Sequence, residues 1–397
     1  MKEKITNAAA RVISATESWK PRRVSLAAAV LYLLYLIGRI ILAAHGDLGA
    51  LVVAGSVFVT ASQVPVHIPV IPGTGYDGQF YFRIAMAPFD FAHHALGVTF
   101  DSVFRMQRIV YPLVSWILSV GSPHLLLFVL PLVNLAALAG LAWVLASFAV
   151  TSGKHPLFGL LVALYPGYAL SLGRDLTEPL AGFTLMLGLY LLDRRRYLPA
   201  ALVLGVSVLT RETGTIVVMA VGIAWLIGVL RGRSEGSPRG LFLAAAVPTV
   251  AFFAWQEVVR SQAGHFVLTG FAESNLGVPF GQLISGIVTR LTSAPNTGNV
   301  LWFIQFAGLT IVVVAALVLI RRSAAPIWVK ISLVVTLILM VSLAGGEWTG
   351  DADLRSIDQL WLLSWLVLFK APRLNLVRWS PLVLIWVITA GQLALFI

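Results

Sequence analysis

Long uncharged apolar runs constrain the fold of this chain more than any other feature of its sequence. Residues 125–150, 300–320 and 381–397 contain no Asp, Glu, Lys or Arg, and a helix needs about 20 residues to cross the hydrocarbon core of a bilayer. Only 11% of the residues are charged, against roughly a quarter in soluble domains. Several such runs predict an all-α, polytopic transmembrane helix bundle.

A polar segment rich in Lys and Arg precedes the first apolar run, residues 26–44. This segment is too long for the charged start of an ordinary signal peptide. We therefore expect residues 1–25 to form a basic cytoplasmic N-terminus and residues 26–397 to form a single transmembrane domain. The chain has no Cys, which excludes disulfides, thiolate metal sites and cysteine nucleophiles.

Basic residues indicate the orientation of the bundle. They cluster in residues 2–23, 194–196, 231–239, 321–322 and 370–378. Because cytoplasmic loops are enriched in Lys and Arg, we expect every cluster on the cytoplasmic side. This rule, together with anionic lipid, accounts for the net charge of +11 without a nucleic-acid partner.

An even number of crossings must separate successive basic clusters, which predicts about eleven transmembrane helices. The crossings are expected at residues 26–44, 124–150, 157–172, 179–192, 198–209, 214–230, 241–255, 300–320 and 327–344, and in two helices after residue 358. The outer loops are then residues 45–108, which we expect to carry interfacial helices, 260–299 and 345–358. Residues 109–120 are too short to cross and are expected to form an interfacial or re-entrant helix.

The carboxylates test this orientation independently, because they play no part in choosing it. Only four of the 17 Asp and Glu residues fall on the cytoplasmic side: Glu3, Glu17, Asp193 and Glu235. The other 13 lie in outer loops or at outer helix ends, whereas all six Lys lie inside. The acidic chemistry is therefore expected on the extracytoplasmic side.

The first candidate cluster lies in residues 75–85 of the first outer loop. Apolar residues recur there at helical spacing and predict an interfacial helix: Phe80, Tyr81, Ile84 and Ala85. Asp77 stands at the start of this helix, where it is either an N-cap or a catalytic carboxylate. Gln79 and Tyr81 are candidate substrate-binding residues.

The second cluster is Arg174, Asp175 and Glu178, just before Pro179. Asp175 and Glu178 are three residues apart and share a helix face if the helix begins there. The alternative is a capped helix start in which Arg174 balances the charge. This alternative explains one carboxylate more easily than both.

The third cluster, Arg211 and Glu212, interrupts an apolar hairpin. It is either a polar turn with a local ion pair or a phosphate site, because a guanidinium offers a fixed fork of donors. Arg355 lies in the acidic stretch 351–358 and is either a solvated loop residue or a second phosphate ligand. All these clusters share the outer side, which is the main functional indication.

Common cofactor motifs are missing from the sequence. Lys154 follows Gly153 without the upstream glycine of a nucleotide-binding loop. His93 and His94 are adjacent and lack metal-ligand spacing. No metal site or other cofactor is therefore predicted, although a divalent metal ion stays compatible with phosphate chemistry.

Three of these stretches together resemble a family. The stretch Tyr-Asp-Gly-Gln-Phe-Tyr-Phe-Arg-Ile-Ala at 76–85 resembles the Trp-Asp-Gly…Ile-Ala motif in the first outer loop of GPI mannosyltransferase II and of related bacterial GT-C enzymes for cell-surface glycans. Thr-Glu-Pro-Leu at 177–180 is similar to that family's Ser/Thr-Glu helix start, and Leu-Thr-Arg-Glu-Thr-Gly at 209–214 to its Thr-Arg-Ser-x-Gly turn. The resemblance covers about a sixth of the chain. Its departures are Tyr76 for Trp and Glu212 for a small residue.

The resemblance implies a GT-C-like fold and an inverting transfer of a sugar, mannose or a similar hexose or pentose. The donor would be a polyprenyl-phosphate carrier, and the acceptor a glycan or lipid at the outer face of a bacterial plasma membrane. Asp77 matches the catalytic aspartate, Glu178 the acid of the second motif and Arg211 the arginine of the third. Such a transfer needs a base and cations for the departing phosphate, which we expect to be Asp77 and Arg211 with Arg355 or Arg174.

Other functions fit parts of the pattern. A transporter or a flippase for lipid-linked glycans also gathers ionisable residues in a helix bundle, but it favours sites at mid-membrane in two related halves. A glycan polymerase or ligase would share the carrier lipid. A non-catalytic scaffold would tolerate loss of Asp77.

Overall fold

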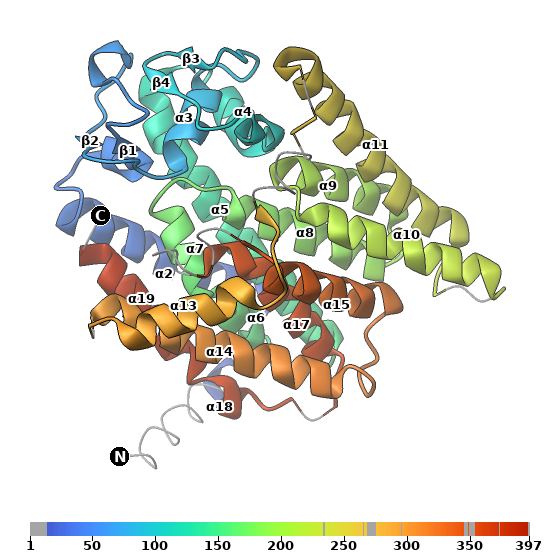
Figure 1. Cartoon of the computed structure of the whole chain (residues 1–397). Helices are drawn as coiled ribbons and strands as arrows, with labels where there is room; N and C mark the ends of the chain where they lie inside the picture. Colours follow the sequence, from blue (N-terminus) through green and yellow to red (C-terminus); the bar gives the residue numbers. More distant parts are fainter. Residues whose placement is uncertain are drawn as a thin grey trace, which may run out of the picture.

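The computed structural model describes residues 14–232, 235–264, 266–267, 275–294, 296–344, 348, 354–372 and 374–395. Helices make up most of this part of the chain (Figure 1). Two short strand pairs accompany them: β1 (Ala54–Gly55) runs parallel to β2 (Val70–Ile71), and β3 (His94–Ala95) runs antiparallel to β4 (Val98–Thr99). The predicted all-α class is confirmed.

Five helical stretches are long and apolar enough to cross a membrane. They are α2 (Pro21–Leu42), α5 (Pro123–Thr151), α11 (Pro238–Ala263), α14 (Thr297–Leu319) and Leu376–Leu395, which comprises α18 (Leu376–Trp379) and α19 (Leu382–Leu395). Large apolar side chains on their outer surfaces are exposed, such as Leu34 on α2 and Val318 on α14. Exposed apolar surface on this scale is favourable against lipid and unfavourable against water. The helices therefore indicate an integral membrane protein.

Shorter helices complete the bundle. They are α8 (Glu178–Asp193), α9 (Tyr197–Thr210), α10 (Gly214–Leu230), α15 (Ile327–Val341) and α17 (Asp358–Phe369). Every residue of α17 is buried, so this helix lies in the interior of the bundle. Its first residue, Asp358, therefore carries a carboxylate into a protein environment instead of into water.

The crossing predicted at residues 157–172 is wrong as a continuous helix. The structure has two short helices there, α6 (Leu157–Ala163) and α7 (Pro166–Leu172). Pro166 has no amide hydrogen, and its ring disfavours helical geometry at the residue before it. Tyr165 accordingly has an extended backbone. The break directs the Tyr165 and Tyr168 hydroxyls toward Leu354 and Asp358.

Two of the predicted non-crossing segments contain short helices. Residues 109–120 hold α4 (Val110–Leu118), whose nine residues extend roughly 13 Å and are too short to span a bilayer alone. The second outer loop, 260–299, contains α13 (Gly281–Thr292). Residues 1–13 of the predicted N-terminus and most of the third outer loop, 345–358, lie outside the described residues.

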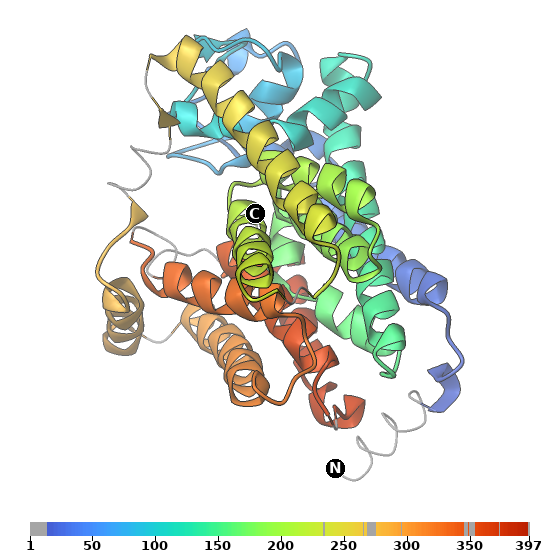
Figure 2. The same cartoon turned by 90° about the vertical axis from the view of Figure 1, so that its right-hand side faces the viewer.

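The first outer loop folds as a cap over one end of the bundle (Figure 2). It contains both strand pairs, η1 (Leu48–Val52), η2 (Ala61–Gln63), α3 (Gly78–Met86) and η3 (Val103–Gln107). The start of α3 rests directly on the turn before α8, since a Cβ on Gly78 would lie 2.3 Å from the carbonyl oxygen of Arg174. A glycine after Asp77 is therefore required for this contact.

Candidate functional site

The carboxylate of Asp77 lies in a cluster of arginines where the cap meets the bundle. Its Oδ2 is 2.7 Å from Nη2 of Arg355 and 3.0 Å from Nη1 of Arg105. Arg355 also binds Glu178, which in turn lies 3.4 Å from Nη1 of Arg211. Arg211 is 3.2 Å from Oδ1 of Asp358. We call the six connected residues the arginine network: Asp77, Arg105, Glu178, Arg211, Arg355 and Asp358.

The N-cap reading of Asp77 is not supported by its geometry. Asp77 occupies the position before α3, but its backbone is helical and its side chain makes no capping hydrogen bond. Burial alone would raise the pKa of this carboxyl, yet Arg355 and Arg105 hold it well below its usual range. Asp77 is therefore ionised at neutral pH and acts as an acceptor for arginine.

Exposure separates the two carboxylates that share Arg355. The side chain of Asp77 keeps 18% of its surface exposed, whereas that of Glu178 exposes none. Asp77 is therefore in contact with solvent, whereas Glu178 is enclosed. Glu178, the first residue of α8, instead holds Arg355 and Arg211 side by side.

Arg355 is not the solvated loop residue that the acidic stretch around it suggests. It begins η4 (Arg355–Ile357) and is 9% exposed. Its Nε donates to the hydroxyl of Tyr76 at 2.9 Å. One guanidinium thus joins the outer loop, the start of α8 and the segment before α17.

Residues 212 and 213 form the predicted turn, but the predicted local ion pair between Arg211 and Glu212 is wrong, because each pairs with other residues. Glu212 accepts two bonds from Arg108, from Nε at 2.8 Å and from Nη2 at 2.5 Å. Arg108 also donates to the hydroxyl of Tyr81 at 2.8 Å. Arg211 and Glu212 therefore bind different partners, although they are adjacent in one turn. Tyr81, which is fully buried, positions Arg108.

Arg174 does not balance the charge of Asp175 or Glu178. Its guanidinium carbon lies 4.3 Å from the centre of the Tyr76 ring, a favourable cation–π position. No carboxylate in the described part of the chain forms an ion pair with Arg174. This arginine therefore keeps hydrogen-bond donors for an added anion beside Asp77.

Asp175 does not share a helix face with Glu178, as the sequence spacing had predicted. The helix α8 begins only at Glu178, and Asp175 has a left-handed backbone with φ of 50°. Asp175 is fully buried, and neither carboxyl oxygen has a hydrogen-bond partner among the described residues. Burial raises the pKa of Asp175 to about 8, so the acid is largely neutral at pH 7.

Gln79 has a structural part in the site. Its Oε1 accepts from the amide of Gly55 at 3.0 Å, and its Nε2 donates to the carbonyl of Thr74 at 2.8 Å. The side chain is 1% exposed. Gln79 therefore connects two parts of the cap and does not face a substrate.

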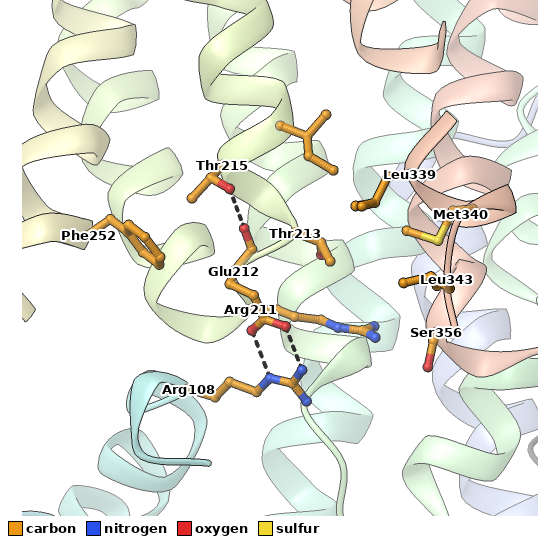
Figure 3. Close-up of a pocket in the computed structure, with 11 residues that line it drawn as sticks. Arg108, Arg211, Glu212, Thr213, Thr215, Phe252, Leu339, Met340, Leu343 and Ser356 are labelled. Carbon is orange, nitrogen blue, oxygen red and sulfur yellow. Dashed lines mark hydrogen bonds and ion pairs between the residues drawn. The ribbon is translucent and has the colours of Figure 1, made fainter. Parts of the chain in front are cut away.

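A pocket opens beside the arginine network (Figure 3). It encloses about 190 Å³. Its polar lining residues are Arg108, Arg211, Glu212, Thr213, Thr215 and Ser356. Its apolar lining residues are Ile216, Phe252, Leu339, Met340 and Leu343, from α10, α11 and the end of α15. Figure 3 shows Phe252 on one side of Arg211 and Glu212, and Met340 and Leu343 on the other. The pocket thus suits a ligand with an anionic head and a hydrocarbon tail.

Sequence reasoning missed several residues of this site: Arg105, Arg108, Tyr168 and the pairing role of Asp358. Arg105 and Arg108 end the first outer loop, and only the surplus of arginine there could have indicated them. Within the described ranges, no group of three or more His, Asp or Glu side chains is arranged to hold a metal ion. Arginine balances the carboxylates: three cations face three anions within the network.

Comparison with protein-family models gives no match, and a search of curated proteins finds no significant match either.

Proposed function

We propose that this protein is a GT-C-type glycosyltransferase of about eleven transmembrane crossings that moves a sugar from a polyprenyl-phosphate carrier to a glycan or lipid acceptor. We place its site on the extracytoplasmic side of a bacterial plasma membrane, with the N-terminus in the cytoplasm. The observation that carries the proposal is the position of a partly exposed, ionised Asp77 in an arginine network beside an amphipathic pocket.

The pocket has the two surfaces that a prenyl phosphate needs. Arg211 and the hydroxyl of Ser356 would donate to the phosphate, and Thr213 also lines the pocket. The tail would follow Phe252 and Met340 toward the apolar surface of α11 and α15. Arginine offers phosphate a paired set of hydrogen bonds that lysine does not.

In the proposed reaction, Asp77 takes the proton of the acceptor hydroxyl. The acceptor oxygen then forms a bond to the anomeric carbon as the bond from that carbon to the carrier phosphate breaks. The electron pair leaves with the phosphate, whose added charge is stabilised by Arg211 and Arg355. One inverted glycosidic bond, a protonated Asp77 and a free carrier phosphate result.

The arginine network connects binding with this chemistry. Arg355 and Arg105 hold Asp77 ionised in the free protein, which also makes it a weak base. A phosphate that binds Arg355 competes with Asp77 for the same guanidinium. Asp77 then loses part of its stabilisation, and its pKa rises toward the value that proton transfer needs.

The proposal is tested by transfer from a panel of radiolabelled polyprenyl-phosphate sugars, with purified protein in lipid. Wild-type protein is expected to transfer, and Asp77→Asn to lose roughly 10²–10⁴-fold in rate. Asp47→Asn is the matched control, because Asp47 lies in the same loop, caps η1 and has no contact with the network. Equal transfer by Asp77→Asn and wild type would exclude the catalytic role. Movement of intact carrier across the bilayer without transfer would favour a flippase.

A further inference from the structure

Helix α13 (Gly281–Thr292) presents three different faces. Its buried face consists of Gly286 and Arg290. Three exposed polar residues form a second face: Ser285, Thr289 and Thr292. The third face is apolar and exposed, with Ile284 at 58%, Val288 at 51% and Leu291 at 69%. We call these last three residues the α13 stripe.

The buried face of α13 fixes the direction of the stripe. Arg290 Nη1 donates to the carbonyl of Trp348 at 2.8 Å, and its guanidinium carbon lies 4.3 Å from the centre of the Trp302 ring. A Cβ on Gly286 would lie 2.3 Å from the same carbonyl oxygen of Trp348. Rotating α13 to bury the stripe would break these contacts. The contacts of Gly286 and Arg290 therefore keep the stripe exposed.

Helix α13 lies at the end of the bundle that carries the pocket. The amides of Gly277 and Phe280 donate to the carbonyls of Ser342 and Val341, at the end of α15. Trp348 in turn donates from Nε1 to the carbonyl of Met340 at 3.0 Å. Met340 lines the pocket. In Figure 2, α13 lies on the outside of the bundle beside α14.

We infer that the α13 stripe is a lipid-binding surface, covered by the bilayer leaflet next to the site, while the polar face points to water. Amphipathic helices with this division bind at membrane interfaces. Arg290 attaches α13 to Trp302 near the start of α14, and α14 is long and apolar enough to cross the membrane. Val300 near this start is 55% exposed, so lipid around α14 would lie next to α13. The only charged residue of α13 is the buried Arg290, so binding depends on apolar contact and not on anionic lipid.

This placement would bring the lipid boundary to the part of the pocket that Met340 lines. A substrate carried on a lipid would then reach the pocket from the leaflet instead of from water. That consequence rests on the proposed function. Lipid binding by the stripe does not, because it follows from the exposure and attachment of α13.

The lack of Cys permits a direct test with single-cysteine variants in nanodiscs of uncharged phosphatidylcholine. Ile284→Cys and Val288→Cys would each carry a polarity-sensitive fluorophore, and lipids with a nitroxide quencher at different chain depths would report contact. Ser285→Cys and Thr289→Cys are matched controls on the polar face. Val314→Cys, 51% exposed within α14, is the control for deep lipid contact.

With the nitroxide near the head group, both stripe positions are expected to be quenched at least about threefold more than the polar-face controls. With the nitroxide deep in the acyl chain, both are expected to be quenched less than Val314→Cys. Equal quenching of stripe and polar face would overturn the inference. Weak quenching of the stripe, together with energy transfer between fluorophores on two copies of the protein, would assign the stripe to a dimer interface and overturn the inference. Neither outcome depends on sugar transfer, so a failure here leaves the proposed function intact.

Discussion

The arginine network is largely buried and Asp175 is fully buried, yet their carboxylates are ionised to different extents. Asp77 has two arginine partners and a pKa below its usual range. Asp175 has no hydrogen-bond partner among the described residues and a pKa raised to about 8. Burial therefore does not by itself identify a functional acid. An anion can take over an arginine that binds a paired carboxylate, whereas a neutral, enclosed acid has no arginine partner to give up.

The largest effect on stability is expected from removing the carboxylate of Glu178, which pairs with both Arg211 and Arg355. Glu178→Gln keeps the size of the side chain but leaves Arg211 and Arg355 each short of a partner. Breaking a buried ion pair costs about 3–5 kcal/mol, so the midpoint of thermal unfolding in detergent should fall clearly. Glu257→Gln, which removes an exposed pair with Arg260, is the control and should leave the midpoint unchanged. An equal, small effect of both would show that the network does not stabilise the fold.

A smaller effect is expected when the charge at 355 is kept but its geometry is lost. Arg355→Lys replaces a fork that reaches Asp77, Glu178 and Tyr76 with a single ammonium group. A charge-assisted hydrogen bond contributes about 1.5–3 kcal/mol, so kcat/KM for transfer should fall roughly 10- to 100-fold. Arg260→Lys on the exposed pair should have no effect. Full activity of Arg355→Lys would exclude a role for the fork.

The convergence predicted from the sequence is confirmed for Asp77, Glu178, Arg211 and Arg355, which now lie in one chain of ion pairs. Their polarity at the ends of apolar runs was sufficient to indicate them. The partners Arg105, Arg108 and Asp358 were not predictable, because long-range contacts decide them. Pairing across more than a hundred residues, as between Arg108 and Glu212, leaves no local signal.

Local spacing also gave two wrong expectations, both near a proline. The break between α6 and α7 depends on Pro166 and on the tyrosines that bind residues 354 and 358. Asp175 and Glu178 do not share a helix face, because α8 starts only at Glu178. In contrast, the bounds predicted for the helix at residues 214–230 agree with α10. Long apolar runs therefore predict helices well, and short polar turns do not.

The third prediction concerns Asp175, whose turn lies between α7 and α8. Its folded pKa of about 8 exceeds the unfolded value of about 4, so the folded state binds more protons between these two values. Wild-type stability should therefore fall as pH rises from about 4 to 8. Asp175→Asn removes this dependence, and its unfolding midpoint should exceed that of wild type increasingly toward pH 8. Parallel pH profiles would contradict a raised pKa.

The central claim, that carrier phosphate and Asp77 compete for Arg355, is tested most directly by measuring binding and transfer in the same variant. Binding of farnesyl phosphate, a short prenyl phosphate, is measured by calorimetry for wild type and Asp77→Asn, alongside sugar transfer. We predict that Asp77→Asn loses transfer while binding farnesyl phosphate at least as tightly as wild type, because Arg355 is released. The account would be contradicted if Asp77→Asn bound farnesyl phosphate tenfold or more weakly than wild type. It would also be contradicted if this variant kept sugar transfer.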